Sequence, residues 1–159
     1  MSRDNAGGGR NIPEAGHPLN AVHYSGLRRK VVFAKRNGGS EPAKQFYQEL
    51  DDEGKDGFDN LFVLMGDHGK ITNKEKFRHK VGSIRCDHAG IGEDFVVSEF
   101  KIHHGPGYRI LAVLEGKVYI LTHGCSKPKD AQLPSEIQRA RKIFCEDRSR
   151  RRSSVVKGS

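Results

Sequence analysis

Apolar residues recur at strand or helix spacing from residue 30 onward, and each run predicts one element of secondary structure. KVVFAKR at 30–36 is a short β-type run closed by NGGS. EPAKQFYQELDDEG at 41–54 and KDGFDNLFVLMGDHG at 55–69 carry their apolar side chains three and four positions apart. This spacing places those side chains on one face of a helix. Two such helices joined by a short glycine-containing link predict an αα-hairpin.

Residues that favour helix caps mark the ends of these two helices. Ser40 is the predicted N-cap of the first helix, with Pro42 in its first turn, and Gly54 is its predicted end. Gly66 or Gly69 is predicted to end the second helix. Acidic side chains are expected on the exposed side of the hairpin, at Glu49, Asp51, Asp52, Glu53 and Asp56.

The pattern changes to strands in the second half of the chain. A basic connection, KEKFRHK at 74–80, leads into three β-type runs. These runs lie at 94–104, 107–114 and 117–123. HGPG separates the first two runs, and the two-residue loop Glu115-Gly116 separates the last two, which is a strong hairpin signal because glycine accepts positive φ. Antiparallel pairing of these strands is therefore predicted.

A last helix is predicted from LPSEIQRARKIF at 133–144. Pro134 falls just before or within its first turn, and Ser135 with Gln138 fits a capping box. Its apolar stripe consists of Ile137, Ala140 and Phe144. The predicted order is β-α-α-β-β-β-α. This order indicates an α+β fold, a small antiparallel sheet with an N-terminal αα-hairpin and a C-terminal helix, its helices gathered on one face of the sheet.

Composition predicts one domain between two tails. The chain of 159 residues suffices for one hydrophobic core, while a hydrophobic fraction of 35% and a mean hydropathy of −0.69 indicate dilution by unstructured segments. Residues 1–30 contain a triple glycine and prolines without periodicity, which predicts a flexible basic tail. Residues 31–147 are the predicted domain, and residues 148–159 are a predicted basic, disordered tail.

The net charge of +8 is distributed unevenly along the chain. Residues 1–30 carry +3 and residues 148–159 carry +5, whereas 31–147 is neutral. Inside that neutral span, 41–67 carries −6 and 68–147 carries +4. Basic surface attracts nucleic-acid phosphates through counterion release, but runs of charge are also ordinary solvated faces. Charge alone leaves both interpretations open.

Several classes of protein do not fit the sequence. No apolar run reaches the length that spans a bilayer, and the N-terminus lacks the apolar block of a signal peptide. The three cysteines form no CxxC pair, so a disulfide is not expected and a reducing cytoplasm is the expected compartment. Cys86-Asp87-His88 and His123-x-Cys125 match no common zinc signature, so neither a metal nor another cofactor is expected.

Arg109 stands near the start of an otherwise apolar strand, 107–114. Arginine is seldom fully buried unless it is paired. Closing the hairpin at its two-residue loop pairs Arg109 with Thr122 and Tyr108 with His123. Arg109 is then an edge residue, one half of a salt bridge, or a working group of a site.

This register divides the polar side chains between two faces, because side chains in a strand alternate. Arg109 shares its face with Leu111 and Val113, which have the character of core residues. The other face holds Tyr108, Lys101 and His123. A β-bulge in either strand would change this division, and bulges occur beside active sites.

The segment FKIHHGPGYRILAVLEGKVYILTHGCSKPKDAQLPSEIQRA contains short motifs in a characteristic order. They are Gly107-Tyr108-Arg109, Glu115-Gly116, His123-Gly124, Lys127 with Lys129, and Pro134-Ser135-Glu136-Ile137 with Ala140. In their order and spacing they resemble the small toxins of bacterial type II toxin–antitoxin systems, in the phage Gp49-like and HigB-like branch of the RelE/ParE superfamily. The resemblance covers residues 31–147. It departs at Cys125, where the family has an aromatic residue, and at Lys127-Pro128-Lys129, where the family has adjacent lysines.

The resemblance implies a metal-independent endoribonuclease, an mRNA interferase that cleaves message on the ribosome and inhibits translation. Attack of a ribose 2′-hydroxyl on the neighbouring phosphate builds negative charge, which preorganised cations stabilise. Arg109 would clamp that phosphate with its planar, always charged guanidinium. Lys101, with a lowered pKa, would be the general base.

Further residues receive roles from the same resemblance. Lys127 would position the RNA or protonate the leaving oxygen, and His123 is a further acid–base candidate if it faces the same pocket. The remaining expected RNA-binding residues are Lys129, Tyr108 and Arg141.

The resemblance also implies partners in the cytoplasm and leaves two alternatives open. A cognate antitoxin that covers the basic half at 68–147, and the ribosome with its mRNA, are the expected partners, with a toxin–antitoxin heterotetramer as one assembly. No membrane partner is expected. The first alternative is a ParE-like toxin that inhibits DNA gyrase without nuclease activity. The second is a non-toxic phage- or plasmid-borne protein of the same fold that acts by partner binding. Convergence of Arg109, Lys101 and Lys127 on one site would favour the nuclease.

Overall fold

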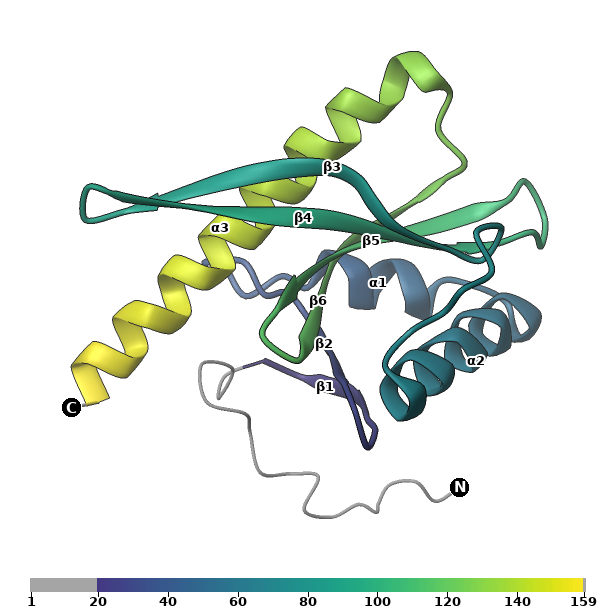
Figure 1. Cartoon of the computed structure of the whole chain (residues 1–159), viewed down its shortest axis with the longest axis horizontal. Coiled ribbons are helices and arrows are strands. Elements are labelled where there is room, and N and C mark those ends of the chain that lie inside the picture. Colours follow the sequence, from purple (N-terminus) through teal and green to yellow (C-terminus); the bar gives the residue numbers. More distant parts are fainter. Residues whose placement is uncertain (1–19, 159) are drawn as a thin grey trace.

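The computed structural model describes residues 20–158, with side chains up to residue 153, and most of the N-terminal tail predicted at 1–30 lies outside the described residues. Strands in this range form one six-stranded sheet in the order β1-β2-β6-β5-β4-β3 (Figure 1). The strands are β1 (Val22–Ser25), β2 (Lys30–Phe33), β3 (Phe77–His88), β4 (Ile91–Ile102), β5 (Tyr108–Glu115) and β6 (Val118–Ser126). β2 runs parallel to β6 and the other neighbours are antiparallel, so the sheet is mixed rather than antiparallel throughout.

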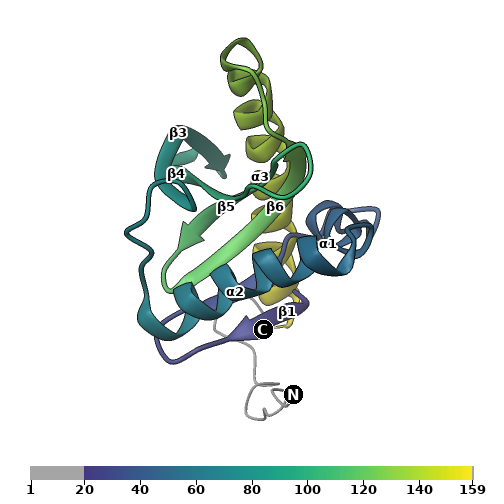
Figure 2. The same cartoon turned by 90° about the vertical axis from the view of Figure 1, so that its right-hand side faces the viewer.

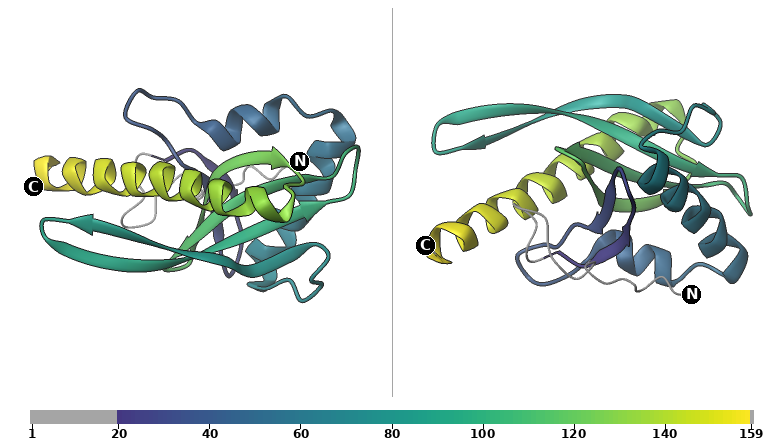
Figure 3. Two further views of the ribbon diagram at one scale, coloured as in Figure 1. Left: turned by 90° about the horizontal axis from the view of Figure 1, so that it is seen from above. Right: turned by 60° about the horizontal axis from the view of Figure 1, so that its bottom comes forward.

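Helices cover both faces of the sheet, as Figures 2 and 3 show. On one face Ile110 and Ala112 of β5 pack in a core with Phe58 and Phe62 of helix α2 (Asp52–His68). On the other face their neighbours on β5 pack against helix α3 (Leu133–Gly158), in a core that contains Leu111, Val113, Ala140, Ile143 and Phe144. The α+β class is confirmed, but the prediction that the helices gather on one face is wrong. Each face of β5 is apolar, so each requires its own helical cover.

The predicted αα-hairpin is present, with different caps. Helix α1 (Pro42–Gln48) begins at Pro42, and Ser40 lies outside it and caps nothing. Asp51 caps α2 by accepting a hydrogen bond from the Gly54 backbone nitrogen at 2.8 Å, so Gly54 lies inside α2 instead of ending α1. Gly69 ends α2 at φ 81°, as predicted. The five acidic side chains expected at the surface of this hairpin are exposed.

Strand β3 was not predicted, because its pattern is broken by extra residues. Arg78 pairs with Glu99, and the next pair in the ladder is Gly82 with Val97. Between these two pairs the chain advances four residues in β3 but only two in β4. The polar residues of this irregular stretch hide the alternation that marks a strand. The segment 74–80, predicted as a connection, therefore contains the start of a strand.

Strand β1 places part of the predicted flexible tail inside the fold. β1 pairs with β2, and His23 lies 2.8 Å from the Asp59 carboxylate of α2. The turn after β1 packs directly on α2, since a Cβ at Gly26 would lie 2.2 Å from the Gly66 carbonyl carbon. The prediction of a flexible segment up to residue 30 is thus wrong for residues 22–30.

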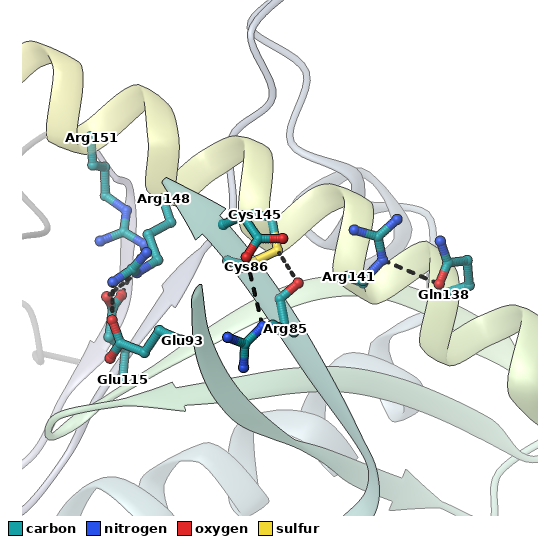
Figure 4. The surroundings of a disulfide bond; sticks show 10 residues. Arg85, Cys86, Glu93, Glu115, Gln138, Arg141, Cys145, Arg148 and Arg151 are labelled. Atoms are coloured by element: carbon teal, nitrogen blue, oxygen red, sulfur yellow. Dashed lines mark hydrogen bonds and ion pairs between the residues drawn. A yellow bond between two sulfur atoms is a disulfide. The ribbon is translucent and has the colours of Figure 1, made fainter. Parts of the chain in front are cut away.

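The predicted disordered tail after residue 147 is instead a continuation of α3. The helix extends to Gly158, and its stripe of Ile137, Ala140 and Phe144 is confirmed. Ser135 lies within the helix, so the predicted capping box is absent. Arg148 and Arg151 are nearly buried and reach the carboxylates of Glu93 and Glu115, as Figure 4 shows. These arginines were predicted to belong to a disordered tail, but their ion pairs hold the helix to the β3–β4 and β5–β6 hairpins.

A disulfide between Cys86 and Cys145 joins β3 to α3 (Figure 4). The expectation of no disulfide is therefore wrong for this pair. Spacing could not have shown it, because the two cysteines are 59 residues apart in sequence and meet only when α3 lies across the sheet. Among the described residues, none of the helices is both long and apolar enough to cross a membrane.

Candidate functional site

A bulge in β6 decides which polar side chains share a face of the sheet. Leu111 pairs with His123, but Ala112 pairs with Leu121, which leaves Thr122 as the extra residue. The hairpin closes with Glu115 opposite Val118, two positions from the predicted register, and beyond the bulge Arg109 pairs with Cys125 rather than with Thr122 as predicted. The insertion reverses the side-chain alternation, so the end of β6 presents a different set of residues to α3.

Lys101 and Arg109 lie on the same face of the sheet, contrary to the predicted division. They are direct partners across β4 and β5, and this face is the one that α3 covers. Tyr108 pairs with Ser126 rather than His123 and packs on the opposite face, with its ring 5.8 Å from that of Phe46 in α1. Tyr108 is therefore separated by the sheet from the residues it was expected to assist.

The Arg109 guanidinium is held by the residues around it. Its side chain is 6% exposed, and its Nε lies 3.8 Å from the carboxylate of Glu99, which is 5% exposed. Nη1 donates to the backbone oxygen of Tyr108 at 3.1 Å and is 3.5 Å from that of Ile102. The salt bridge that the sequence left open as an alternative is thus present. Glu99 was missed as a site residue, although it stands two positions from Lys101 and so on the same strand face.

A glycine turn brings Lys127 beside Arg109. The Gly107 carbonyl accepts a 2.7 Å hydrogen bond from the Lys127 backbone nitrogen. A Cβ at Gly107, whose φ is 84°, would lie 3.6 Å from the Lys127 Cβ and 3.8 Å from the Arg109 Nη1. Lys127 is exposed, and its stem lies next to the guanidinium across a residue that has no side chain. The structure therefore groups three of the four expected catalytic residues, Lys101, Arg109 and Lys127, around this turn.

His123 faces α3, but its ring is buried. Its Nε2 lies 2.8 Å from the Glu136 carboxylate of α3, and its Nδ1 lies 3.2 Å from the Thr122 hydroxyl. Burial lowers the pKa of His123, opposed by its hydrogen bond to Glu136. A neutral imidazole can donate through Nε2 to that carboxylate. His123 is thus placed to orient Glu136, which is 23% exposed, rather than to reach a substrate itself.

The pKa values of Lys101 and Cys125, the two residues that pair with Arg109, are shifted in opposite directions. Burial lowers the pKa of Lys101, and the nearby charges of Arg109 and Arg78 lower it further, against the effect of Glu99. This direction suits a general base. Burial raises the pKa of Cys125 to about 12, so its thiol is not an activated nucleophile.

The other expected RNA-binding residues are less closely grouped. Lys129 is exposed and its backbone nitrogen donates to the Gln132 side chain at 2.9 Å, where a turn leads into α3. Arg141 lies farther along α3 and donates to Gln138 at 3.2 Å; Figure 4 shows it between Gln138 and the disulfide. Of the two, Lys129 lies two residues after Lys127 in the segment that follows β6, whereas Arg141 is half-buried two turns into α3.

A second polar cluster joins the end of β4 to the start of α2. His104 Nε2 lies 2.8 Å from Asp51 and its Nδ1 lies 3.3 Å from Glu53. The hydrogen bond to Asp51 raises the pKa of His104, and the same bond lowers the pKa of Asp51. Among the described residues, no three His, Cys, Asp or Glu side chains are arranged to hold a metal ion.

The His104–Asp51 pair predicts a pH-dependent contribution to stability. The raised pKa of His104 means that its contribution is complete below its ordinary value of 6.5 and is lost as pH rises through the folded-state pKa. The lowered pKa of Asp51 means that its contribution is present above 3.8 and is lost as pH falls through its folded-state pKa. We expect an NMR titration midpoint for His104 above 6.5 that moves back toward 6.5 in Asp51→Asn. Asp52→Asn, next to it and exposed, should leave the midpoint unchanged; equal shifts in both variants would contradict the pairing.

Comparisons with known proteins leave the chain unplaced. A scan against protein-family models, a search of curated proteins and a search of solved structures each found no match.

Proposed function

We propose that the protein is the toxin of a type II toxin–antitoxin system and acts as a ribosome-dependent mRNA endonuclease. The motifs from Gly107 to Ala140 support this proposal through their resemblance to the Gp49-like and HigB-like branch of the RelE/ParE superfamily. The observation that carries it is the grouping of Lys101, Arg109 and Lys127 around the Gly107 turn. In the register expected from the sequence, Lys101 and Arg109 would have been on opposite faces.

These three basic side chains suit a cleavage that uses the ribose 2′-hydroxyl as nucleophile, with Lys101 as the neutral amine and the other two as cations. The reaction passes through a phosphorane-like state with extra negative charge, which fixed positive groups stabilise without a metal. Arg109 would contact this phosphate, because its guanidinium is fixed by Glu99 and by two backbone oxygens. Lys101 would accept the hydroxyl proton, as its lowered pKa favours. Lys127 would protonate the leaving oxygen.

Glu136 is an addition to the expected catalytic set. It is partly exposed on the same face, and the buried His123 ring fixes its carboxylate at 2.8 Å. A carboxylate held in this way can accept a proton or a hydrogen bond from a ribose hydroxyl. His123 then acts through Glu136 as a positioning residue.

The proposed partners are a cognate antitoxin, the ribosome and its mRNA. Lys101, Lys127, Lys129 and Arg139 leave the candidate site bordered by half-buried or exposed basic side chains. An acidic segment of the antitoxin would cover these charges and block access of RNA to Arg109. A heterotetramer of two toxins and two antitoxins is the proposed assembly.

A ParE-like toxin that inhibits gyrase by protein contact is the second candidate. The burial of Arg109 and its ion pair with Glu99 favour it, because a paired arginine has less charge to offer a phosphate. The same burial and ion pair of Arg109 are equally compatible with a non-toxic protein that acts only by partner binding.

Expression and cleavage assays separate these functions. We expect expression of the chain alone to arrest growth, and co-expression with an adjacent antitoxin gene to restore it. Purified protein should cut message on programmed ribosomes, with cuts mapped by primer extension, and should leave gyrase supercoiling unaffected. Growth arrest with intact message and inhibited gyrase would select the ParE-like function, and harmless expression would contradict both toxins.

A further inference from the structure

Arg78 of β3 lies on the same face of the sheet as the candidate site. In the ladder it pairs with Glu99 of β4, which stands two positions from Lys101. The residue before it, Phe77, packs in the core on the α2 side of the sheet. Because side chains alternate along a strand, Arg78 faces the opposite side, which is the side of Arg109. Arg78 thus borders the site from a strand that was not predicted.

The backbone around Arg78 is fixed by contacts of its two neighbours. The Phe77 ring centroid lies 4.9 Å from that of Phe100. The His79 carbonyl accepts a 2.6 Å hydrogen bond from the hydroxyl of Ser98, which is buried. This bond holds the irregular stretch of β3 that follows Arg78. Such irregularities occur beside active sites, where they redirect side chains.

Arg78 differs from Arg109 in exposure. The Arg109 side chain is 6% exposed, and its Nε lies 3.8 Å from the Glu99 carboxylate. Arg78 is exposed, and no carboxylate of the described residues forms an ion pair with it. A guanidinium in this position keeps its full charge and its planar fork available to a phosphate. Arg78 can therefore make the contact that the burial of Arg109 restricts.

The charge of Arg78 also acts on the candidate general base. Burial is the main cause of the lowered pKa of Lys101. The charges of Arg109 and Arg78 lower this pKa further, whereas nearby carboxylates raise it. Because the interaction of two charges weakens with distance, this effect agrees with the position of Arg78 across the ladder from the Lys101 strand.

We propose that Arg78 is a further residue of the candidate site and binds an RNA phosphate at its β3 border. The inference rests on the proposed function for the identity of the ligand as RNA, and it adds a phosphate contact to that function. Arg78, Lys101 and Arg109 lie on three consecutive strands, β3, β4 and β5 (Figure 1). Lys127 comes directly after β6, the next strand of the sheet. An RNA strand bound by these side chains therefore crosses the sheet from β3 toward the end of β6.

Binding of a 2′-O-methyl RNA hexanucleotide to the full chain tests this contact, because 2′-hydroxyl attack cannot cleave this RNA. Arg78→Ala should weaken binding about fivefold. It should also reduce the slope of log K against log salt by about 0.7, the loss of one single-strand phosphate contact. Arg78→Lys should bind within about twofold of the wild type, since lysine also holds phosphates as a point charge.

Arg85→Ala is the matched control on the same strand. Arg85 is also exposed, but it alternates with the buried Ile84 and Cys86 and so faces away from α3. Its Nη1 lies 3.1 Å from the Asp94 carboxylate. Arg85→Ala should weaken RNA binding less than twofold. Both variants should keep the urea unfolding midpoint of the wild type, which excludes loss of folding as the cause of weaker binding.

An NMR titration of Lys101 gives a second result that does not depend on RNA. Removal of the Arg78 charge should move the Lys101 midpoint up toward 10.5, and Arg85→Ala should leave it unchanged. Equal weakening of binding by the two variants, an unchanged salt slope in Arg78→Ala, or no RNA binding by the wild type would overturn the Arg78 contact even if the protein cleaves message. Selective weakening by Arg78→Ala would support the contact even if no cleavage is found and the proposed nuclease function fails.

Discussion

Arg109→Ala is expected to lower cleavage of ribosome-bound message by about 100-fold or more per folded molecule. The substitution removes the guanidinium that would stabilise charge on the scissile phosphate. It should also lower the free energy of unfolding by about 3 kcal/mol, because it leaves Glu99 buried without its ion-pair partner. Cleavage rates and urea unfolding curves measured on the same preparation give both values.

Two companion variants separate the catalytic effect from the structural one. Glu99→Gln breaks the same ion pair but keeps the guanidinium, so it should destabilise the protein and retain cleavage within about tenfold per folded molecule. Arg109→Lys keeps a positive charge but not the planar fork, so it should rescue cleavage poorly. If Arg109→Ala cleaves like the wild type once its unfolded fraction is counted, Arg109 is only a structural salt bridge.

The parts of the fold that could be predicted are those with a regular local pattern. The αα-hairpin follows from apolar residues at helical spacing. The β5–β6 hairpin follows from Gly116, although its two-residue loop is Gly116-Lys117 and not Glu115-Gly116 as predicted. β3 has no such pattern, because its irregular pairing with β4 between Arg78 and Gly82 interrupts the alternation. The position of α3 on the second face depends on tertiary packing, which a local pattern does not encode.

Most residues of the candidate site could be named from the sequence, but their positions relative to one another could not. Arg109, Lys101 and Lys127 were identified from motifs, but Lys101 shares a face with Arg109 through the pairing of β4 with β5, and the bulge at Thr122 sets which residues at the end of β6 lie beside Arg109. A bulge of this kind leaves no mark in composition or spacing. Glu99 could have been found, since it stands two positions from Lys101 in a strand.

The spacing of the arginines after residue 147 indicates a helix, which the net charge of the segment does not show. Phe144, Arg148 and Arg151 are separated by four and three positions, which places them on one helix face. The carboxylates that pair with them come from two distant hairpins, so their neutralisation was not visible from the helix alone. A run of basic residues at a chain end is therefore not sufficient evidence for a disordered tail.

Asp147→Ala provides the strongest test of this ordered helix end. Asp147 is fully buried and accepts hydrogen bonds from the Asn20 side chain and the Lys35 backbone nitrogen, each at 2.7 Å. It also pairs with Arg150 at 3.2 Å and with Arg151. Its removal leaves these donors unsatisfied near the junction of α3, β2 and the segment before β1. We expect the free energy of unfolding in urea to fall by about 4 kcal/mol.

Glu146→Ala is the matched control, since it removes the adjacent carboxylate from a more exposed position. Glu146 is 24% exposed and contacts Arg36 at 2.9 Å, so its loss should cost about 1 kcal/mol or less. Hydrogen exchange reports on the same contrast: amides of residues 148–153 should be protected in the wild type and in Glu146→Ala but exchange rapidly in Asp147→Ala. Rapid exchange of these amides in the wild type would show that the helix end is unstable in solution. Equal destabilisation by both variants would mean that the buried network around Asp147 does not anchor it.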